Sequence, residues 1–230
     1  MKKEASSYTI KQILSIILFL DSLAVTLAIA RAVILDISPA TYFGEIGRDG
    51  YITYISFLQL SIAAIFAFRI FRVAKLSPKL NQSGFFWLVV GIGLFFLALD
   101  DVVGIHEQLD YWLHDLFDLE ETEITDMADD LIVGGYLAIG LIFVVSQWQA
   151  IKIFNQAFIF FRLGFVLASV MVLLDIVTSN MFFVSTITDN FTLQLAIKRW
   201  LSAIEDSTKI FAEGILIVGT YKCWQIARKS

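Results

Sequence analysis

Residues 85–107 read FFWLVVGIGLFFLALDDVVGIHE, an apolar run that ends in two aspartates, a histidine and a glutamate. A helix of about 20 apolar residues is long enough to cross the hydrocarbon core of a bilayer. Asp100, Asp101, His106 and Glu107 would then lie at the end of a membrane span, where ionisable side chains are costly and usually functional. This stretch therefore predicts both the fold class and the position of a site.

The whole chain has the composition of a helical membrane protein. Of its 230 residues, 58% are hydrophobic and 17% are charged, and the mean hydropathy is +0.76. Soluble domains are nearer half apolar and a quarter charged. The apolar runs do not alternate with polar residues, which argues against an outer-membrane β-barrel. We expect an all-α integral membrane bundle that forms a single domain over residues 1–230.

Charge and cysteine content exclude several classes of protein. The net charge is −5, from 17 basic and 22 acidic residues, so there is no basic surface for nucleic acid. Cys223 is the one cysteine, which excludes an intramolecular disulfide and a Cys-x-x-Cys metal site. The sequence shows no nucleotide or haem motif. The expected partner is the lipid bilayer, and a homo-oligomer or a membrane-complex partner is left open.

Six segments are apolar enough to cross the bilayer, at residues 13–35, 51–73, 85–105, 131–150, 157–180 and 203–222. If these spans alternate in direction, most basic residues fall on one side of the membrane: Lys2, Lys3, Lys11, Arg69, Arg72, Lys75, Lys79, Lys152, Arg162, Lys222, Arg228 and Lys229. The opposite loops contain only Arg48, Lys198 and Arg199 as bases. The positive-inside rule therefore predicts that both termini are cytoplasmic, and we expect a bacterial inner (plasma) membrane location.

The loop expected at residues 106–130, on the outer face, is acidic. Twelve of the 22 acids lie between Asp100 and Asp130, with both histidines and no lysine or arginine. Apolar residues in the first part of this loop keep helical spacing. The third span therefore either continues beyond the membrane or breaks into an interfacial helix that carries Tyr111 and Trp112 at head-group level.

Acids at the outer end of the third span need a positive partner. Asp100 and Glu107 share a helical face with Gly93 and Gly104, which predicts close packing of this face against a neighbouring helix. The helix macrodipole disfavours negative charge at a helix C-terminus. We therefore expect a metal ion, a buried base or protons beside these acids.

The last span carries a second acidic motif. Asp206 and Glu213 share a helical face, and Lys209 lies within the same arc. Ser202 and Glu205 have the spacing of a capping box, which predicts a helix start at this point. Because one lysine cannot neutralise three carboxylates, Glu213 is the stronger candidate for a functional residue.

Carboxylates and imidazole without thiols suit a divalent metal ion, and the pattern does not distinguish Zn, Mn, Fe and Ca. The predicted ligands are Asp100, Asp101, His106, Glu107, Asp206 and Glu213. Residues expected behind these ligands or in ion pairs are Glu205, Lys209, Asp130, Asp175, Arg31 and Asp36.

Four of the charged residues have simpler alternatives. Arg31 can pair with Asp36 or Asp175, because buried charges are usually paired. Asp130 can stabilise the N-terminus of the fourth span. The sequence gives no role for Asp21 and does not decide whether His114 belongs to the site.

The string from Phe96 to Glu107 resembles a motif of uncharacterised bacterial multipass membrane proteins, in which Asp-Asp/Glu is followed by four residues and His-Glu. The last span of those proteins resembles Glu205-Asp206-Ser207-Thr208-Lys209. The resemblance covers two short stretches and implies no activity. It implies only that the two acidic motifs belong together.

Two better-known families are excluded. Alkaline-ceramidase-like hydrolases need three zinc-binding histidines, and this chain has two histidines. Microbial rhodopsins place an acid four residues before their Schiff-base lysine, as Glu205 precedes Lys209, but they have seven spans.

The sequence leaves three functions open. The first is an outward-facing divalent metal site, which could make the protein an enzyme acting on a membrane-associated substrate by activating water or polarising a phosphoryl or acyl group. The second is a cation or proton-coupled transporter or channel whose relay includes Glu213, Lys209 and Asp21. The third is a non-catalytic subunit of a membrane complex whose acidic loop docks a basic partner.

Overall fold

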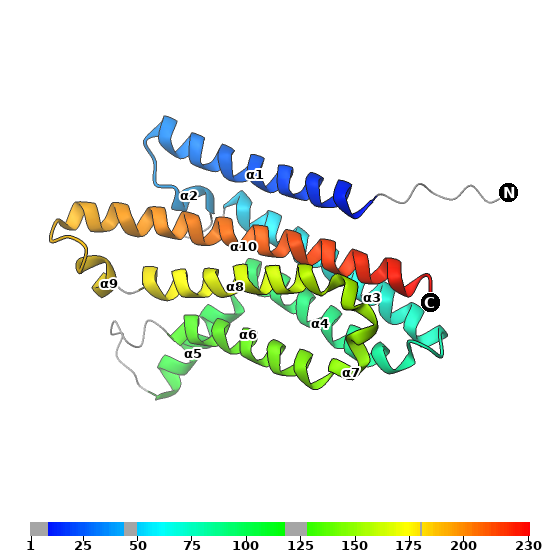
Figure 1. Ribbon diagram of the computed structural model, residues 1–230. Helices are drawn as coiled ribbons and strands as arrows, with labels where there is room; N and C mark the ends of the chain where they lie inside the picture. The colour runs from blue at the N-terminus through cyan, green and yellow to red at the C-terminus, as the bar shows by residue number, and fades with distance from the viewer. Residues whose placement is uncertain (1–8, 44–49, 118–127, 180) are drawn as a thin grey trace.

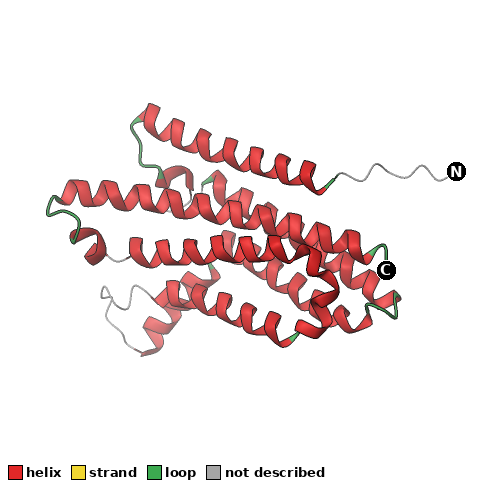
Figure 2. Cartoon of the chain, in the orientation of Figure 1, coloured by secondary structure: helices red, strands yellow, loops and turns green. Residues whose placement is uncertain are grey.

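The computed structural model describes residues 9–43, 50–117, 128–179 and 181–230, and these residues form a bundle of helices with no strand among them (Figures 1 and 2). The helices are α1 (Ile10–Leu35), α2 (Ala40–Phe43), α3 (Tyr51–Leu76), α4 (Asn81–Val103), α5 (Ile105–Phe117), α6 (Ala128–Ser146), α7 (Trp148–Ile151), the 3-10 helix η2 (Lys152–Ala157), α8 (Phe158–Ser179), α9 (Met181–Ser185) and α10 (Phe191–Ala227). The expected all-α class is confirmed for this part of the chain. The side chains of residues 40, 128–130, 179, 181 and 182 lie outside the described part.

Four helical segments are long and apolar enough to cross a membrane: α1, α3, α4 and the stretch Trp148–Thr178 that includes α8. They correspond to four of the six predicted spans. The apolar part of α6, Leu131–Ser146, is shorter. Helix α10 has 37 residues and contains the charged motif of the last predicted span.

The predicted start of the last helix is wrong. Helix α10 begins at Phe191, where the Asn190 side chain accepts a hydrogen bond from the Leu193 amide at 3.3 Å. Ser202 and Glu205 therefore lie in the helix interior and form no capping box. Because Glu205 and Asp206 are far from the helix N-terminus, the macrodipole does not explain these two acids.

A single glycine separates α4 from α5. Gly104 has a φ of 65°, a left-handed conformation that glycine adopts without steric cost, and its amide donates to the Asp100 carbonyl oxygen at 2.6 Å. Of the two alternatives left by the sequence, the helix breaks and does not continue. Tyr111 and Trp112 are exposed on α5, which lies beside α6 (Figure 1).

Helix α1 lies at the edge of the bundle and packs mainly against α10 (Figure 1). Its buried residues are Asp21, Ala24, Ala28 and Ala32, which follow one face of the helix. The other faces expose large apolar side chains such as Phe19, Leu20 and Ile34. Apolar side chains on the outside of a bundle are expected where lipid replaces water as the solvent.

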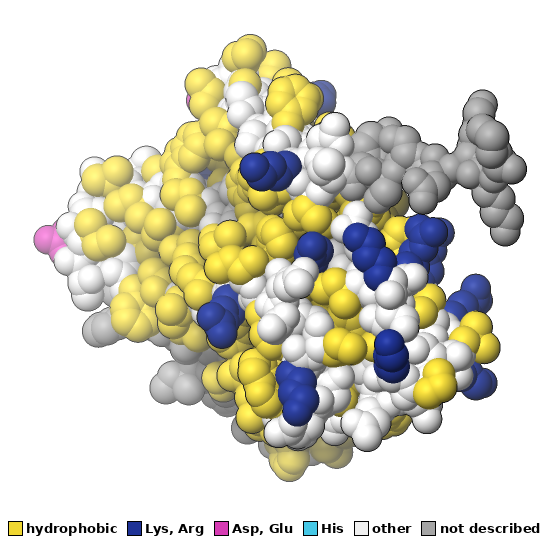
Figure 3. All heavy atoms as spheres, turned by 45° about the vertical axis from the view of Figure 1, so that its right-hand side comes forward, with side chains coloured by type: hydrophobic (Ala, Val, Ile, Leu, Met, Phe, Trp, Pro, Cys, Tyr) yellow, Lys and Arg dark blue, Asp and Glu magenta, His cyan; other side chains and the backbone are white. Residues whose placement is uncertain are grey.

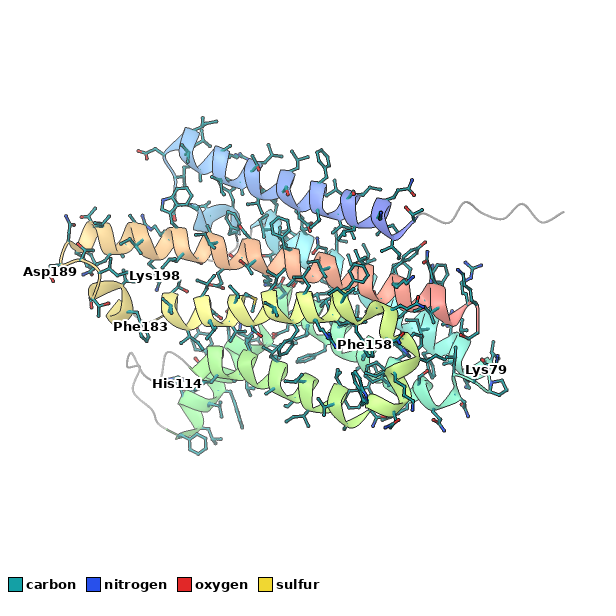
Figure 4. All side chains as sticks on the ribbon, in the orientation of Figure 1. Lys79, His114, Phe158, Phe183, Asp189 and Lys198 are labelled. Atoms are coloured by element: carbon teal, nitrogen blue, oxygen red, sulfur yellow. The ribbon has the colours of Figure 1, made fainter. Side chains whose placement is uncertain are left out.

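The two ends of the bundle differ in charge. The C-terminus, the α3–α4 turn with Lys79 and the first turn of α1 lie at one end, which we call the basic end (Figures 1 and 4). His114, Asp189 and Lys198 lie toward the other end, where α4 meets α5 and α10 begins; we call it the acidic end (Figure 4). Lysine and arginine side chains are spread over the basic end in Figure 3.

Candidate functional site

An ion pair inside the bundle joins the two acidic motifs of the sequence. Lys209 on α10 donates from Nζ to the Asp101 carboxylate on α4. The two side chains are largely buried, with exposed fractions of 25% and 11%. A buried base is one of the three positive partners expected beside these acids, and Lys209 is that base.

Further carboxylates lie around Lys209. Those of Glu213 and Asp206, on the same helix, are close enough to attract its ammonium group. Glu205 lies one turn away, where the carboxylates of Asp175 and Asp206 repel its own. Glu205 also accepts a hydrogen bond from the Thr178 hydroxyl of α8 at 3.2 Å. Helices α4, α8 and α10 thus bring acids to one region.

Glu213 extends this charged region toward the middle of the bundle. Its side chain has an exposed fraction of 7% and accepts a hydrogen bond from the Ser56 hydroxyl of α3 at 2.8 Å. Glu213 lies one turn after Lys209 on α10, and the two charges attract each other. The sequence analysis did not select Ser56.

Asp21, to which the sequence gave no role, is the most buried acid of this region. Its exposed fraction is 1%, and its Oδ1 accepts a hydrogen bond from Gln59 Nε2 on α3 at 2.6 Å. Gly214 on α10 makes this approach possible, because a Cβ there would lie 2.6 Å from Asp21 Oδ2 and 2.5 Å from Ile17 Cγ2. Polar residues inside the apolar run 51–73 were the signal that could have found Ser56 and Gln59.

These contacts involve a group of neighbouring polar side chains, which we call the buried polar network. It consists of Asp101, Lys209, Glu213, Ser56, Gln59 and Asp21. Ser56 and Gln59 are one turn apart on α3, so the network passes from α4 through α10 and α3 to α1. Four of its buried oxygens have no hydrogen-bond donor in the described protein: Asp101 Oδ2, Glu213 Oε2, Gln59 Oε1 and Asp21 Oδ2.

Asp100 has a different role from its neighbour. Its carboxylate accepts from the His106 backbone amide at 2.8 Å and lies 2.9 Å from His106 Nδ1. Both bonds hold the first turn of α5 against the end of α4. The Asp100 carboxylate lies at the C-terminal end of α4, where the helix dipole disfavours negative charge. The N-terminal end of α5 offsets this, because its dipole and its free amides favour a carboxylate.

The six predicted metal ligands divide between these arrangements. Asp101, Asp206 and Glu213 gather around Lys209, whereas Asp100 and His106 contact each other and Glu107 lies on α5. In the described part of the chain, no group of three or more His, Cys, Asp or Glu side chains is placed to hold a metal ion. The metal site stays a prediction of the sequence.

The remaining predicted residues lie apart from the buried polar network or outside the description. The Arg31 guanidinium lies 5.0 Å from the centre of the Tyr42 ring, and Asp36 is the left-handed residue that ends α1. His114 lies 3.2 Å from the Asp110 carboxylate within α5. Lys2, Lys3 and Arg48 of the predicted topology, residues 118–127 of the acidic loop and the Asp130 side chain lie outside the described residues.

The predicted close packing of the glycine face on α4 is wrong at Gly93. No atom lies within 4 Å of a Cβ built at this residue. The close approach is found instead at Gly91, where a Cβ would lie 2.7 Å from the Phe68 ring of α3. The close contact of α4 with a neighbouring helix is therefore made at Gly91, two residues before the predicted Gly93.

Comparison with known proteins identifies a family without an assigned function. No curated protein and no solved structure matches the chain. A family model described as a domain of unknown function, DUF8692, matches residues 12–223 and so includes every residue of the buried polar network. The chain therefore belongs to the DUF8692 family.

Proposed function

We propose that this protein moves protons or small cations across a membrane and that the buried polar network is part of their path. Four helices supply ionisable or polar groups to the interior of a bundle whose core is mostly apolar. Ionisable residues inside membrane proteins are expensive and commonly mark ion pathways and proton relays. The metal-dependent enzyme and the non-catalytic subunit remain predictions of the sequence.

The observation that supports this proposal best is the set of four buried oxygens without a donor. An unsatisfied carboxylate or amide oxygen away from water loses free energy relative to a hydrogen-bonded one. A proton, a cation or a hydrating water would satisfy such an oxygen. The unsatisfied oxygens lie on Asp101, Glu213, Gln59 and Asp21, so they are distributed along the network and not confined to one end.

The network ends before the basic end of the bundle. There, α3, α4 and α10 meet in an apolar core that includes Ile70, Leu80, Trp87 and Cys223, all almost fully buried. A proton or cation that reaches Asp21 would therefore meet an apolar layer. This arrangement suits a path that opens in steps, and it does not suit a permanently open pore.

We also propose six membrane crossings, with α6 and α10 as the fourth and sixth. Helix α10 is about 55 Å long at a rise of about 1.5 Å per residue, so its central part can cross while its first turns extend beyond the hydrocarbon core. Residues 61–99, 131–174 and 214–230 contain no Asp or Glu, and nine of the lysines and arginines lie in them. This charge pattern supports a cytoplasmic basic end with both termini.

Flux measurements on purified protein in liposomes test the proposal. A potassium gradient with valinomycin sets a membrane potential that drives protons into the vesicles, where a pH-sensitive dye reports them. Parallel vesicles contain sodium or potassium indicators. We expect flux of at least one ion above that of protein-free vesicles. Glu213→Gln and Asp21→Asn should each lower it by about tenfold or more, because each removes a charge that a relay needs.

Asp115→Asn provides the matched control, because this acid is exposed on α5 and lies outside the buried polar network. It should leave the flux unchanged. Flux no greater than in protein-free vesicles for every ion, or full flux in Glu213→Gln and Asp21→Asn, would overturn the proposal.

A further inference from the structure

At the basic end, two arginines lie on one tryptophan. The Arg228 Cζ atom lies 4.8 Å from the centre of the Trp224 ring, and the Arg69 Cζ atom lies 5.7 Å from it. Arg69 lies in the second half of α3 and Arg228 directly follows the end of α10, so the cluster joins two helices of the bundle. The face of an aromatic ring attracts a cation, so both guanidinium groups interact favourably with the same indole.

Two further rings support Trp224. The ring centres of Phe66, Tyr221 and Trp224 are 5.3, 5.8 and 5.7 Å apart in the three pairs, and Arg69 also lies 5.7 Å from Phe66. Tyr221 is buried and Trp224 is half-buried, whereas both arginines are exposed. The aromatic platform is therefore fixed by the bundle, and the two guanidinium groups are accessible.

Neither guanidinium has a carboxylate partner among the described residues, where the ion pairs involve Asp100, Asp101 and Asp110. The sequence around both arginines is free of acids from residue 61 to residue 99 and from residue 214 to the C-terminus. Guanidinium groups bind phosphate through two parallel hydrogen bonds, so two of them held on one ring favour a phosphate ligand.

The surface next to Arg69 indicates that this phosphate belongs to a lipid. Leu58, Ile62 and Ile65 precede Arg69 at helical spacing on α3, and all three are exposed. They form an apolar strip that runs from Arg69 toward the middle of the bundle. A phospholipid matches both features, because its acyl chain can lie along the strip while its phosphate reaches the arginines. Aromatic and basic residues together are typical of the head-group region.

We infer that Arg69 and Arg228, held on Trp224, form a binding site for the phosphate of an anionic phospholipid. The inference does not depend on ion transport, because the cluster lies at the end of the bundle where the buried polar network is absent. If the lipid site is disproved, the proposed ion transport is unaffected. If ion transport is disproved, the lipid site is unaffected.

The test compares phospholipids that share acyl chains and differ in head group. Purified full-length protein in a neutral detergent receives phosphatidylglycerol or phosphatidylcholine, and native mass spectrometry and thermal unfolding report binding. We expect phosphatidylglycerol to bind at least tenfold more tightly than phosphatidylcholine and to raise the Tm. The variant Arg69→Gln/Arg228→Gln should lose this preference and the Tm increase.

The matched control is Lys79→Gln/Arg162→Gln, which removes two exposed charges outside the cluster. It should keep the full preference. Trp224→Phe, which keeps a ring and both charges, should weaken binding by a smaller factor and serves if the arginine variant does not fold. Three outcomes would overturn the inference of a lipid site. The two lipids could bind equally tightly, or the control variant could lose the lipid preference as fully as the arginine variant. Inorganic phosphate could also raise the Tm as much as phosphatidylglycerol does.

Discussion

The same helices build two very different interiors at the two halves of the bundle. Toward the acidic end, α3, α4 and α10 enclose the buried polar network with the Asp101–Lys209 ion pair. Toward the basic end they enclose an apolar core in which the Trp87 ring lies 5.2 Å from those of both Phe86 and Phe154. The second region shows that these helices pack together without any charge between them.

This difference indicates that the buried polar network is not needed to assemble the bundle. Removing two charges from water costs free energy that their attraction repays only in part, and well-packed apolar residues often serve stability as well or better. Among the described residues, the interior has charges toward the acidic end and none toward the basic end. Function therefore explains these charges better than stability does. Substitutions in each half test that explanation.

The largest effect is expected when the ion pair is broken on one side. Lys209→Met leaves Asp101 buried without its partner and should lower the free energy of unfolding by about 3–5 kcal/mol. Unfolding by SDS in mixed micelles, followed by circular dichroism, measures this change.

The double variant Asp101→Asn/Lys209→Met removes both charges and should recover most of the lost stability while ion flux stays lost. If the double variant is as unstable as Lys209→Met, the pair stabilises the fold and the contrast between the two halves is wrong.

The apolar spans were predictable because hydrophobicity is a local property of the chain. The predicted spans 13–35 and 51–73 correspond to α1 and α3, which begin and end within three residues of the predicted limits. The start of α10 was not predictable in this way. Lys198 and Arg199 interrupt the apolar residues in the first turns of that helix, and Ser202 has the sequence pattern of a cap that Asn190 in fact provides.

A smaller effect is expected where α1 approaches α10. Gly214→Ala places a Cβ against Asp21 Oδ2 and Ile17 Cγ2, so α1 must move away from the network. We expect a loss of about 1–3 kcal/mol, typical of overpacking, together with reduced flux. The same micelle unfolding and the liposome assay measure both quantities.

Gly93→Ala is the matched control, because the space beside Gly93 on α4 is open. It should leave stability unchanged or raise it by up to about 1 kcal/mol through helix propensity. Equal losses in the two variants would show that the close approach at Gly214 does not position Asp21.

The candidate site was predictable only as a set of costly residues. Charges inside apolar runs identified Asp101, Lys209 and Glu213, because their cost does not depend on the partner. The partners Ser56 and Gln59 are neutral and come from a distant part of the chain, so no spacing rule connects them to Glu213 and Asp21. Asp100 and Asp101 look equivalent in sequence, yet they point to different partners.

That last difference gives the smallest predicted effect. Asp100→Ala removes the acceptor of the His106 amide at 2.8 Å, so α5 loses a capping interaction, with an expected cost of about 1 kcal/mol. Asp100→Asn keeps an acceptor oxygen and should cost less. Because Asp100 lies outside the buried polar network, both variants should retain wild-type ion flux, whereas Asp101→Asn should not. Flux lost equally in the Asp100 and Asp101 variants would place Asp100 in the path and remove the distinction between the local contact of one aspartate and the long-range contact of the other.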